Sequence, residues 1–301
     1  MRIELVKRPQ QSKLFSALSP FIALGLTLVA TAGEMDLSFP SIVAFASYVF
    51  SILFQEYQLT WLALVAALAV GTLMGMVNGL IVTQLGIPSM IATLAMMFLW
   101  GGLVTVISSG ISIAIPDAQG TLLHTVMVGR IGGIVPVQIF WSIAITGVIW
   151  AILNRHRFGE SILFIGDSAR VAKVVGIPIE VERVKLFTLM GFLSALAGVF
   201  LTLETTTYFT TQGQGYLLTV IAAVFIGGTS IFGGSGKVIG TFFASLIVAT
   251  IEAGLVASGI QGFWTRFFIG FVFILSVVMN TAIEDPYKVP LIRSIRNRFG
   301  R

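Results

Sequence analysis

The sequence predicts an all-α bundle that spans a membrane about nine times. Its composition is 56% hydrophobic and only 10% charged, whereas soluble domains carry about 25% charged residues. Nine apolar stretches approach the roughly 20 residues that a helix needs to cross about 30 Å of hydrocarbon. Segments of about ten residues with alternating polarity, typical of a membrane β-barrel, are absent from the sequence. We therefore expect helices that satisfy their own backbone hydrogen bonds.

The predicted spans differ in length. The second and the seventh are short, and both border Gly-rich or polar breaks. A weak internal echo links Gly33–Ser47 with Gly228–Ser245, because each segment interrupts an apolar run and then begins another span. Transporters often contain such repeats, so the sequence leaves open an internal repeat. In chain order the spans are 14–32, 40–54, 60–83, 89–109, 136–153, 186–206, 217–233, 238–258 and 263–281.

The rare residue types exclude several classes of function. The chain has no cysteine and only two histidines, so disulfides, Cys-based metal sites and His clusters are not expected. The net charge of +5 comes from basic residues in the tails and in one central segment, which is the distribution of the positive-inside rule rather than a nucleic-acid-binding surface. We expect no metal, no cofactor, no nucleic-acid partner and no catalytic residue.

Ten of the 31 charged residues lie between residues 154 and 185. Six of these ten are Lys or Arg, and five more basic residues lie in the tail 282–301, so both segments are predicted to be cytoplasmic. Counting spans places the loop 110–135 outside. The basic residues of 1–13 then fall on the wrong side, which leaves three explanations: a cleaved signal peptide, a missing first helix, or an incomplete first span.

The central charged segment contains a predicted short helix. Asp167 and Ser168 suit a helix N-cap, and Gly176 followed by Pro178 suits a stop. Basic side chains occupy one face and valines another. Such a helix can rest on anionic lipid headgroups or dock into another protein. The residues assigned to it are Asp167, Ser168, Arg170, Val171, Lys173, Val174 and Gly176.

Polar residues in or beside spans are candidates for a transport pathway, because they are costly in lipid. Asp36, Ser38, Asn78 and Thr93 form this set. An alternative for Asp36 and Ser38 is a capping turn at the span that begins near Pro40.

A second Gly-rich stretch, 226–237, contains GGSGK but is not a phosphate-binding loop. The Lys of such a loop is followed by Ser or Thr and precedes a helix of a soluble βαβ unit, whereas Lys237 is followed by Val238. The glycines are instead expected to permit close helix packing or a sharp turn. This predicted structural turn comprises Gly227, Gly228, Gly233 and Gly234.

In this order, the motifs resemble the permease subunits of bacterial ABC importers for ribose, xylose and related monosaccharides, over about residues 20–281. The first, Gly33–Ser38, is similar to the G-x-x-D-L-S element of that family. The others are Asn78-Gly79, Ile87-Pro88, Ile91–Leu94, Phe158-Gly159, Ile165-Gly166, Ala169, Gly176-Ile177, Gly215-Tyr216, Ile221–Val224, Ile226–Ser230 and Phe232–Gly234.

The resemblance implies a single transmembrane permease domain over 1–301 in the bacterial inner membrane. Residues 154–185 would be the coupling loop that docks on a separate cytoplasmic ATPase. A second permease subunit, in a homodimer or heterodimer, and a periplasmic substrate-binding protein would complete the importer. Members usually have ten spans, so the resemblance makes 14–32 a true span and favours a gene model that lacks a first helix over a nine-span variant.

Three alternatives stay open at this point. Permeases of the same superfamily transport branched-chain amino acids or nucleosides, but the branched-chain amino-acid permeases usually lack the D-L-S element. A channel or secondary carrier would need no ATPase, and the short helix would then have no partner. A membrane-embedded enzyme would need clustered acids, histidines or a nucleophile around one cavity, and the sequence offers none.

Overall fold

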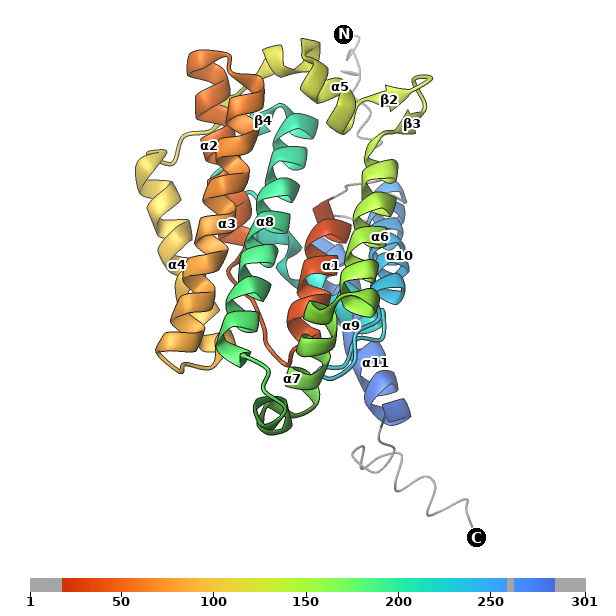
Figure 1. Cartoon of the computed structure of the whole chain (residues 1–301). Helices are drawn as coiled ribbons and strands as arrows, with labels where there is room; N and C mark the ends of the chain where they lie inside the picture. Colours follow the sequence, from red (N-terminus) through yellow and green to blue (C-terminus); the bar gives the residue numbers. More distant parts are fainter. Residues whose placement is uncertain (1–17, 259–262, 285–301) are drawn as a thin grey trace.

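The computed structural model describes residues 18–258 and 263–284, which form a helical bundle (Figure 1). The basic segment 1–13 and most of the predicted tail, 285–301, lie outside the described residues. In chain order the elements are α1 (Leu18–Thr31), α2 (Phe39–Tyr57), α3 (Thr60–Gln84), α4 (Ser89–Ile107), β1 (Ile113–Ala114), η1 (Pro116–Gly120), α5 (Leu122–Val128), β2 (Arg130–Ile131), β3 (Val135–Pro136), α6 (Gln138–Arg155), α7 (Arg157–Val174), α8 (Ile179–Thr205), β4 (Thr207–Tyr208), η2 (Gln214–Tyr216), α9 (Leu217–Ile226), α10 (Val238–Ala257) and α11 (Phe263–Glu284).

Each of the nine predicted spans coincides with a helix. Six are long and apolar enough to cross a membrane, namely α2, α3, α4, α6, α8 and α10, and three shorter apolar stretches lie in α1, at α9 and in α11. The seventh span was predicted too long, because α9 ends at Ile226. Its ten residues rise only about 15 Å. The helix stops because Gly228 has a left-handed backbone (φ +86°) and no Cβ opposes that conformation.

The two ends of the bundle carry different structures (Figure 1). At one end, here called the α5 face, lie α5 and the β2–β3 pair, and β1 pairs with β4 across sequence-distant loops. At the opposite end, the α7 face, lies α7. The charged segment 154–185 is more helical than a loop: α6 continues to Arg155, and α8 begins at Ile179 rather than 186. Acidic residues lie in the first turns of α7 (Glu160) and α8 (Glu180 and Glu182), where the helix dipole favours negative charge.

Helix α1 is the central element of the bundle. Every residue from Ser19 to Thr31 is buried, by contacts with α8, α9, α10 and α6. Helix α1 is antiparallel to α8: Phe21 stacks edge-on against Phe200 at 4.9 Å between ring centroids, and Gly25 abuts Met190. A helix covered on all sides can be apolar around its whole circumference, as this one is.

The packing reveals an inverted repeat of four helices. Helix α1 packs on α9 and α10, and α8 packs on α2 and α3 in the same manner. Within each unit the second helix contacts the third and the fourth, so α1–α4 corresponds to α8–α11. Because α1 and α8 are antiparallel, the two units have opposite orientations, as in many transporters. This repeat differs in register from the sequence echo between Gly33–Ser47 and Gly228–Ser245.

Helices α3 and α8 approach closely through glycines spaced four residues apart. Gly71, Gly75 and Gly79 lie on one face of α3, and Gly191 of α8 faces the first two. A Cβ at Gly75 would overlap the carbonyl oxygen of Phe187 and lie 2.8 Å from the Cα of Gly191. Small residues at this spacing allow two membrane helices to come into backbone contact.

Candidate functional site

Three of the four predicted pathway residues, Asp36, Ser38 and Asn78, meet in one hydrogen-bonded network at the break between α1 and α2. The side chain of Asp36 accepts hydrogen bonds from the Ser38 hydroxyl (2.6 Å) and the Ser38 backbone N–H (2.8 Å). The amide of Asn78 donates to Ser38 Oγ at 2.6 Å and accepts from Nε1 of Trp100 at 3.0 Å. Asp36, Ser38 and Asn78 are fully buried. The network therefore joins the break to α3 and α4.

The first turn of α4 holds the backbone of the same break. Met35 N–H donates to Ser89 Oγ at 3.0 Å, and Leu37 N–H donates to Thr93 Oγ1 at 3.0 Å. Backbone groups that leave a helix inside a membrane protein need such partners, because lipid supplies none. The break is thus a built, extended segment that runs along the α7-face ends of α3 and α4.

Ser38 takes the N-cap position that the capping alternative predicts, but its side chain does not cap α2, and Pro40 lies in the first turn. The Ser38 hydroxyl is engaged with Asp36 and with Asn78 instead. The second carboxylate oxygen of Asp36, Oδ2, is buried and has no hydrogen-bond partner within the described residues. A buried carboxylate oxygen without a partner is unusual and requires an explanation.

An ion pair fastens the break to the start of α8. Arg183 Nη2 lies 2.7 Å from Glu34 Oε1, and the two side chains are 30% and 8% exposed. Sequence reasoning missed this pair, together with Trp100 and Ser89. The sequence does show opposite charges at the ends of two spans. Because they lie about 150 positions apart, nothing in the sequence indicates that they pair.

Four glycines from three segments form a contact point that we call the glycine junction: Gly33, Gly166, Gly233 and Gly234. Gly234 N–H donates to the carbonyl oxygen of Thr31 at 2.8 Å. A Cβ at Gly166 would overlap this same oxygen and the Gly234 nitrogen, and a Cβ at Gly233 would lie 2.9 Å from Gly33 Cα. Three backbones approach here with no room for side chains, so both breaks rest against α7.

The predicted structural turn 227–234 divides into two roles. Gly228, Gly233 and Gly234 have positive φ values of 86°, 86° and 76°, which favour glycine. Gly227 has a helical φ of −68° and instead packs directly on Gly240 and Thr241 at the start of α10. The stretch is therefore both a sharp turn and a close helix contact.

The short helix of the charged segment begins next to the glycine junction. Helix α7 is interrupted at Ser168 (φ −158°, ψ 105°), and the helical residues resume after it. Ser168 Oγ accepts from Val171 N–H at 3.4 Å. The helix ends where Gly176 adopts φ +86° and Ile177 N–H donates to Ala172 O at 3.0 Å, a glycine-terminated C-cap.

This helix is anchored by one side and exposed on the others. Ala172 is buried with Ile165 and Ile179. Arg170 and Lys173 are exposed, and beside them the side chain of Val174 is 83% exposed. Exposed valines beside basic residues form a mixed surface of the kind that protein interfaces use.

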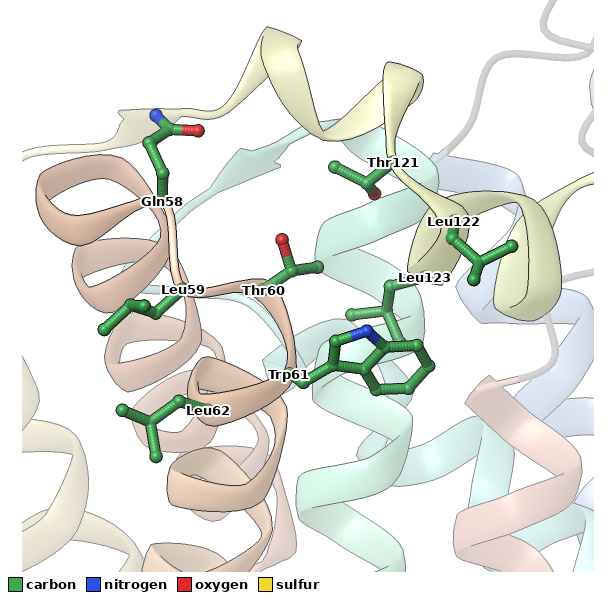
Figure 2. A pocket seen from close by; sticks show the side chains of 8 residues that line it. All are labelled: Gln58, Leu59, Thr60, Trp61, Leu62, Thr121, Leu122 and Leu123. Carbon is green, nitrogen blue, oxygen red and sulfur yellow. The ribbon is translucent and has the colours of Figure 1, made fainter.

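A pocket of about 320 Å³ lies at the opposite end of the molecule, between the α2–α3 turn and α5 (Figure 2). None of the predicted site residues lines it. Its walls are mostly apolar, and Trp61 is exposed there. Tryptophan at a helix end is typical of the membrane–water boundary. The lining residues are Gln58, Leu59, Thr60, Trp61, Leu62, Thr121, Leu122 and Leu123.

Residues 18–258 and 263–284 contain no group of three His, Cys, Asp or Glu side chains suited to a metal ion. The site is thus a buried polar break, a glycine junction and an exposed helix, in contact with one another. A family model described as "branched-chain amino acid transport system / permease component" matches residues 14–277. The chain belongs to this permease family.

Curated relatives cover most of the permease. The ribose import permease protein RbsC of Bacillus subtilis is 33% identical over 267 residues, which are 88% of this chain and 81% of that protein. RbsC of Escherichia coli K12 is 29% identical over 269 residues, 88% and 83% of the two chains. The autoinducer 2 import system permease protein LsrD of Salmonella typhimurium is 29% identical over 247 residues, 79% and 73%. No solved structure gives a match.

Family and helices together define the class of protein. The permease is a multi-pass membrane protein and a component of a transport pathway rather than an enzyme. The predicted resemblance to permeases of this type is confirmed.

Proposed function

We propose that the permease forms the membrane pathway of a bacterial ABC importer for a monosaccharide or a similar small polar solute. The observation that carries this proposal is the alignment of ribose import permeases from two bacteria over 88% of the chain. The proposed location is the bacterial inner membrane, with the α7 face in the cytoplasm. This orientation agrees with the basic residues of 154–185.

In this proposal the exposed helix after Ser168 docks on a separate cytoplasmic ATPase, which hydrolyses ATP. Asp167 and Ser168 set the start of the helix, and Gly176 sets its end. Arg170, Val171, Lys173 and Val174 would supply the contacts. Exposed valines beside basic side chains form the mixed polar and apolar surface of a protein interface, which supports a protein partner. Residues 154–185 would be the coupling loop of a single domain.

The glycine junction supplies a physical route from this helix to the membrane breaks. Gly166 contacts Thr31 and Gly234 directly, and Gly234 also lies against the backbone of Asp167. A displacement of α7 would therefore move both breaks, since no flexible side chain separates the three backbones. Asp36, Ser38, Asn78 and Thr93 would respond next, because they hold the first break to α3 and α4. We propose these four as residues of the gate beside the pathway.

The further partners are a second permease subunit and a periplasmic substrate-binding protein, which would approach the α5 face. Branched-chain amino acids and nucleosides are less supported as substrates, because the curated relatives cited above are named for ribose and autoinducer 2. A secondary carrier is also less supported, since it would leave the exposed helix without a role.

Uptake in the source bacterium tests this proposal. Deleting the gene is expected to reduce uptake of a radiolabelled monosaccharide such as ribose at least tenfold, and to leave leucine uptake unchanged. Depleting ATP should abolish uptake, whereas an ionophore that dissipates ion gradients should leave it unchanged. This pair of results distinguishes an ATP-driven importer from an ion-driven carrier. Asp36→Asn should lower uptake after complementation, whereas the matched variant Asp117→Asn, at an exposed residue of the α5 face, should restore it. Loss of leucine uptake alone would overturn the assignment.

A further inference from the structure

A polar stretch of chain enters the membrane-spanning part of the bundle between α8 and α9. Residues 207–216, here called the polar segment, leave the α5 face at β4, which pairs with β1, and end where α9 begins. Gly213 lies against α2. A Cβ at this glycine would be 2.7 Å from the carbonyl oxygen of Pro40 and 3.0 Å from the side chain of Val43.

This contact with α2 lies about half-way across the membrane. Ile42 is 3.3 Å from the Cβ position of Gly71, which is at the middle of α3 (Thr60–Gln84). Helix α3 is long and apolar enough to cross the membrane. Helix α9 follows the polar segment, and its ten residues rise about 15 Å, half of the hydrocarbon thickness. The polar segment therefore carries the chain from the α5 face to the middle of the membrane.

Gln212 fixes the inner side of the polar segment. Its buried side chain donates to Thr202 Oγ1 at 3.0 Å and accepts from the backbone N–H of Phe209 at 3.1 Å. Gly213 has φ +98°, a conformation that glycine adopts without steric cost. The side chain of Gln212 and the close approach of Gly213 thus hold the segment to α8 and α2.

The other side of the polar segment is open. Thr211, Gln214 and Gly215 are exposed, and the side chain of Phe209 is 48% exposed. Irregular backbone does not face lipid at this depth, because lipid offers its polar groups no hydrogen bonds. It occurs there only where protein covers it or where it lines a water-filled cavity.

The chemistry of this open side suits a neutral solute. The sequence has no charged residue between Glu204 and Lys237. A branched-chain amino acid would leave its two charges unpaired here, which is costly away from bulk water. Gln214 and Thr211 each offer a hydrogen-bond donor and an acceptor, and Phe209 offers an apolar surface. The hydroxyl groups and the C–H faces of a monosaccharide match this combination.

We infer that the polar segment lines a water-filled pathway at mid-membrane, where Thr211 and Gln214 hydrogen-bond the hydroxyl groups of the passing solute. This inference rests on the proposed function, because it takes the solute to be a neutral monosaccharide. Gly213 lies against Pro40, two residues after Ser38. A solute that passes the polar segment from the α5 face would therefore reach the proposed gate next.

Thiol labelling tests whether the segment lines water. The chain has no cysteine, so Thr211→Cys and Gln214→Cys each introduce a single thiol. Both should react with a charged methanethiosulfonate in membrane fragments that are open on both faces and contain the whole transport complex. Val148→Cys is the matched control, because Val148 is exposed within the span α6, and its thiol should stay unmodified in lipid. Protection of the two thiols of the segment would overturn the inference, since a second subunit would then cover it.

Uptake tests the contact with the solute. Gln214→Ala should lower ribose uptake about fivefold through the lost hydrogen bond, while the amount of permease in the membrane stays unchanged. Gln214→Asn keeps an amide and should restore most of the uptake, which a purely structural role would not predict. Gln119→Ala is the matched control at an exposed glutamine of the α5 face and should import normally. Normal uptake by Gln214→Ala would overturn the contact.

Failure of the proposed function would give a different result. If the wild type imports no monosaccharide, the proposed function is wrong, and so is the contact with a sugar. Thiol labelling needs no solute, so it would still decide whether the polar segment lines water.

Discussion

The backbone N–H of Gly234 donates a hydrogen bond to the carbonyl oxygen of Thr31 across 2.8 Å. Thr31 ends α1, and Gly234 lies in the turn between α9 and α10, so the bond ties together the two places where membrane helices are interrupted. Gly166 of α7 packs onto this bond. The three segments are therefore expected to move as one unit.

Crowding this unit should destabilise the permease. Gly166→Ala places a methyl group onto the Thr31 carbonyl oxygen, and overpacking of this kind costs about 1–3 kcal/mol. The expected result is a lower midpoint of thermal unfolding in detergent, together with reduced uptake. Gly147→Ala is the matched control, because its Cβ meets nothing within 4 Å. An unchanged midpoint for Gly166→Ala would show that the junction is loosely packed.

Removing the Asn78 amide should weaken the first break. Asn78→Ala leaves the Trp100 indole N–H without its acceptor and removes the donor to Ser38. A buried polar group left unsatisfied costs about 1–3 kcal/mol. Chemical denaturation should show this loss, whereas Asn154→Ala should change stability by less than about 0.5 kcal/mol, because Asn154 is exposed and donates only within its own helix. Equal effects of the two variants would argue against the network.

The pair Glu34–Arg183 should couple more strongly than the pair Glu182–Lys185. Glu34 is nearly buried, whereas Lys185 is 57% exposed. Double-mutant cycles with alanine should give about 1 kcal/mol or more for the first pair and about 0.5 kcal/mol or less for the second. Raising the salt concentration should weaken mainly the second. A reversed order would mean that Glu34 is solvated in the membrane-bound protein.

The contact between α3 and α8 should depend on Gly75. Gly75→Ala drives a methyl group into the Phe187 carbonyl oxygen, so we expect a loss of about 1–3 kcal/mol of stability. Gly102→Ala, on a face of α4 with nothing within 4 Å, should be neutral. Thermal unfolding of the two variants in the same detergent makes the comparison. Similar midpoints would contradict close packing at Gly75.

The sequence was most informative where composition decides the structure. Each of the nine apolar runs falls on a helix of the described residues, and Ser168 and Gly176 located the short helix, because caps and left-handed residues are local features. Long-range relationships were not accessible: Trp100 with Asn78, Glu34 with Arg183, and the glycine junction join segments far apart in the chain. The repeat was sought as matching residues in the sequence. It is visible only in how the helices pack, because many different apolar sequences can form the same packing. The glycines at 71, 75 and 79 recur every four residues, a spacing that predicts close helix packing, but this spacing was not used in the prediction.

Co-purification of an ATPase from native membranes tests the central claim most directly. The wild-type permease and a control, Arg130→Glu on the α5 face, should each retain a cytoplasmic ATPase. The double variant Arg170→Glu with Lys173→Glu should lose it, because both reversed charges lie on the exposed helix of α7. Equal retention by all three proteins would contradict this docking surface. Absence of any ATPase from the wild-type preparation would contradict the importer itself.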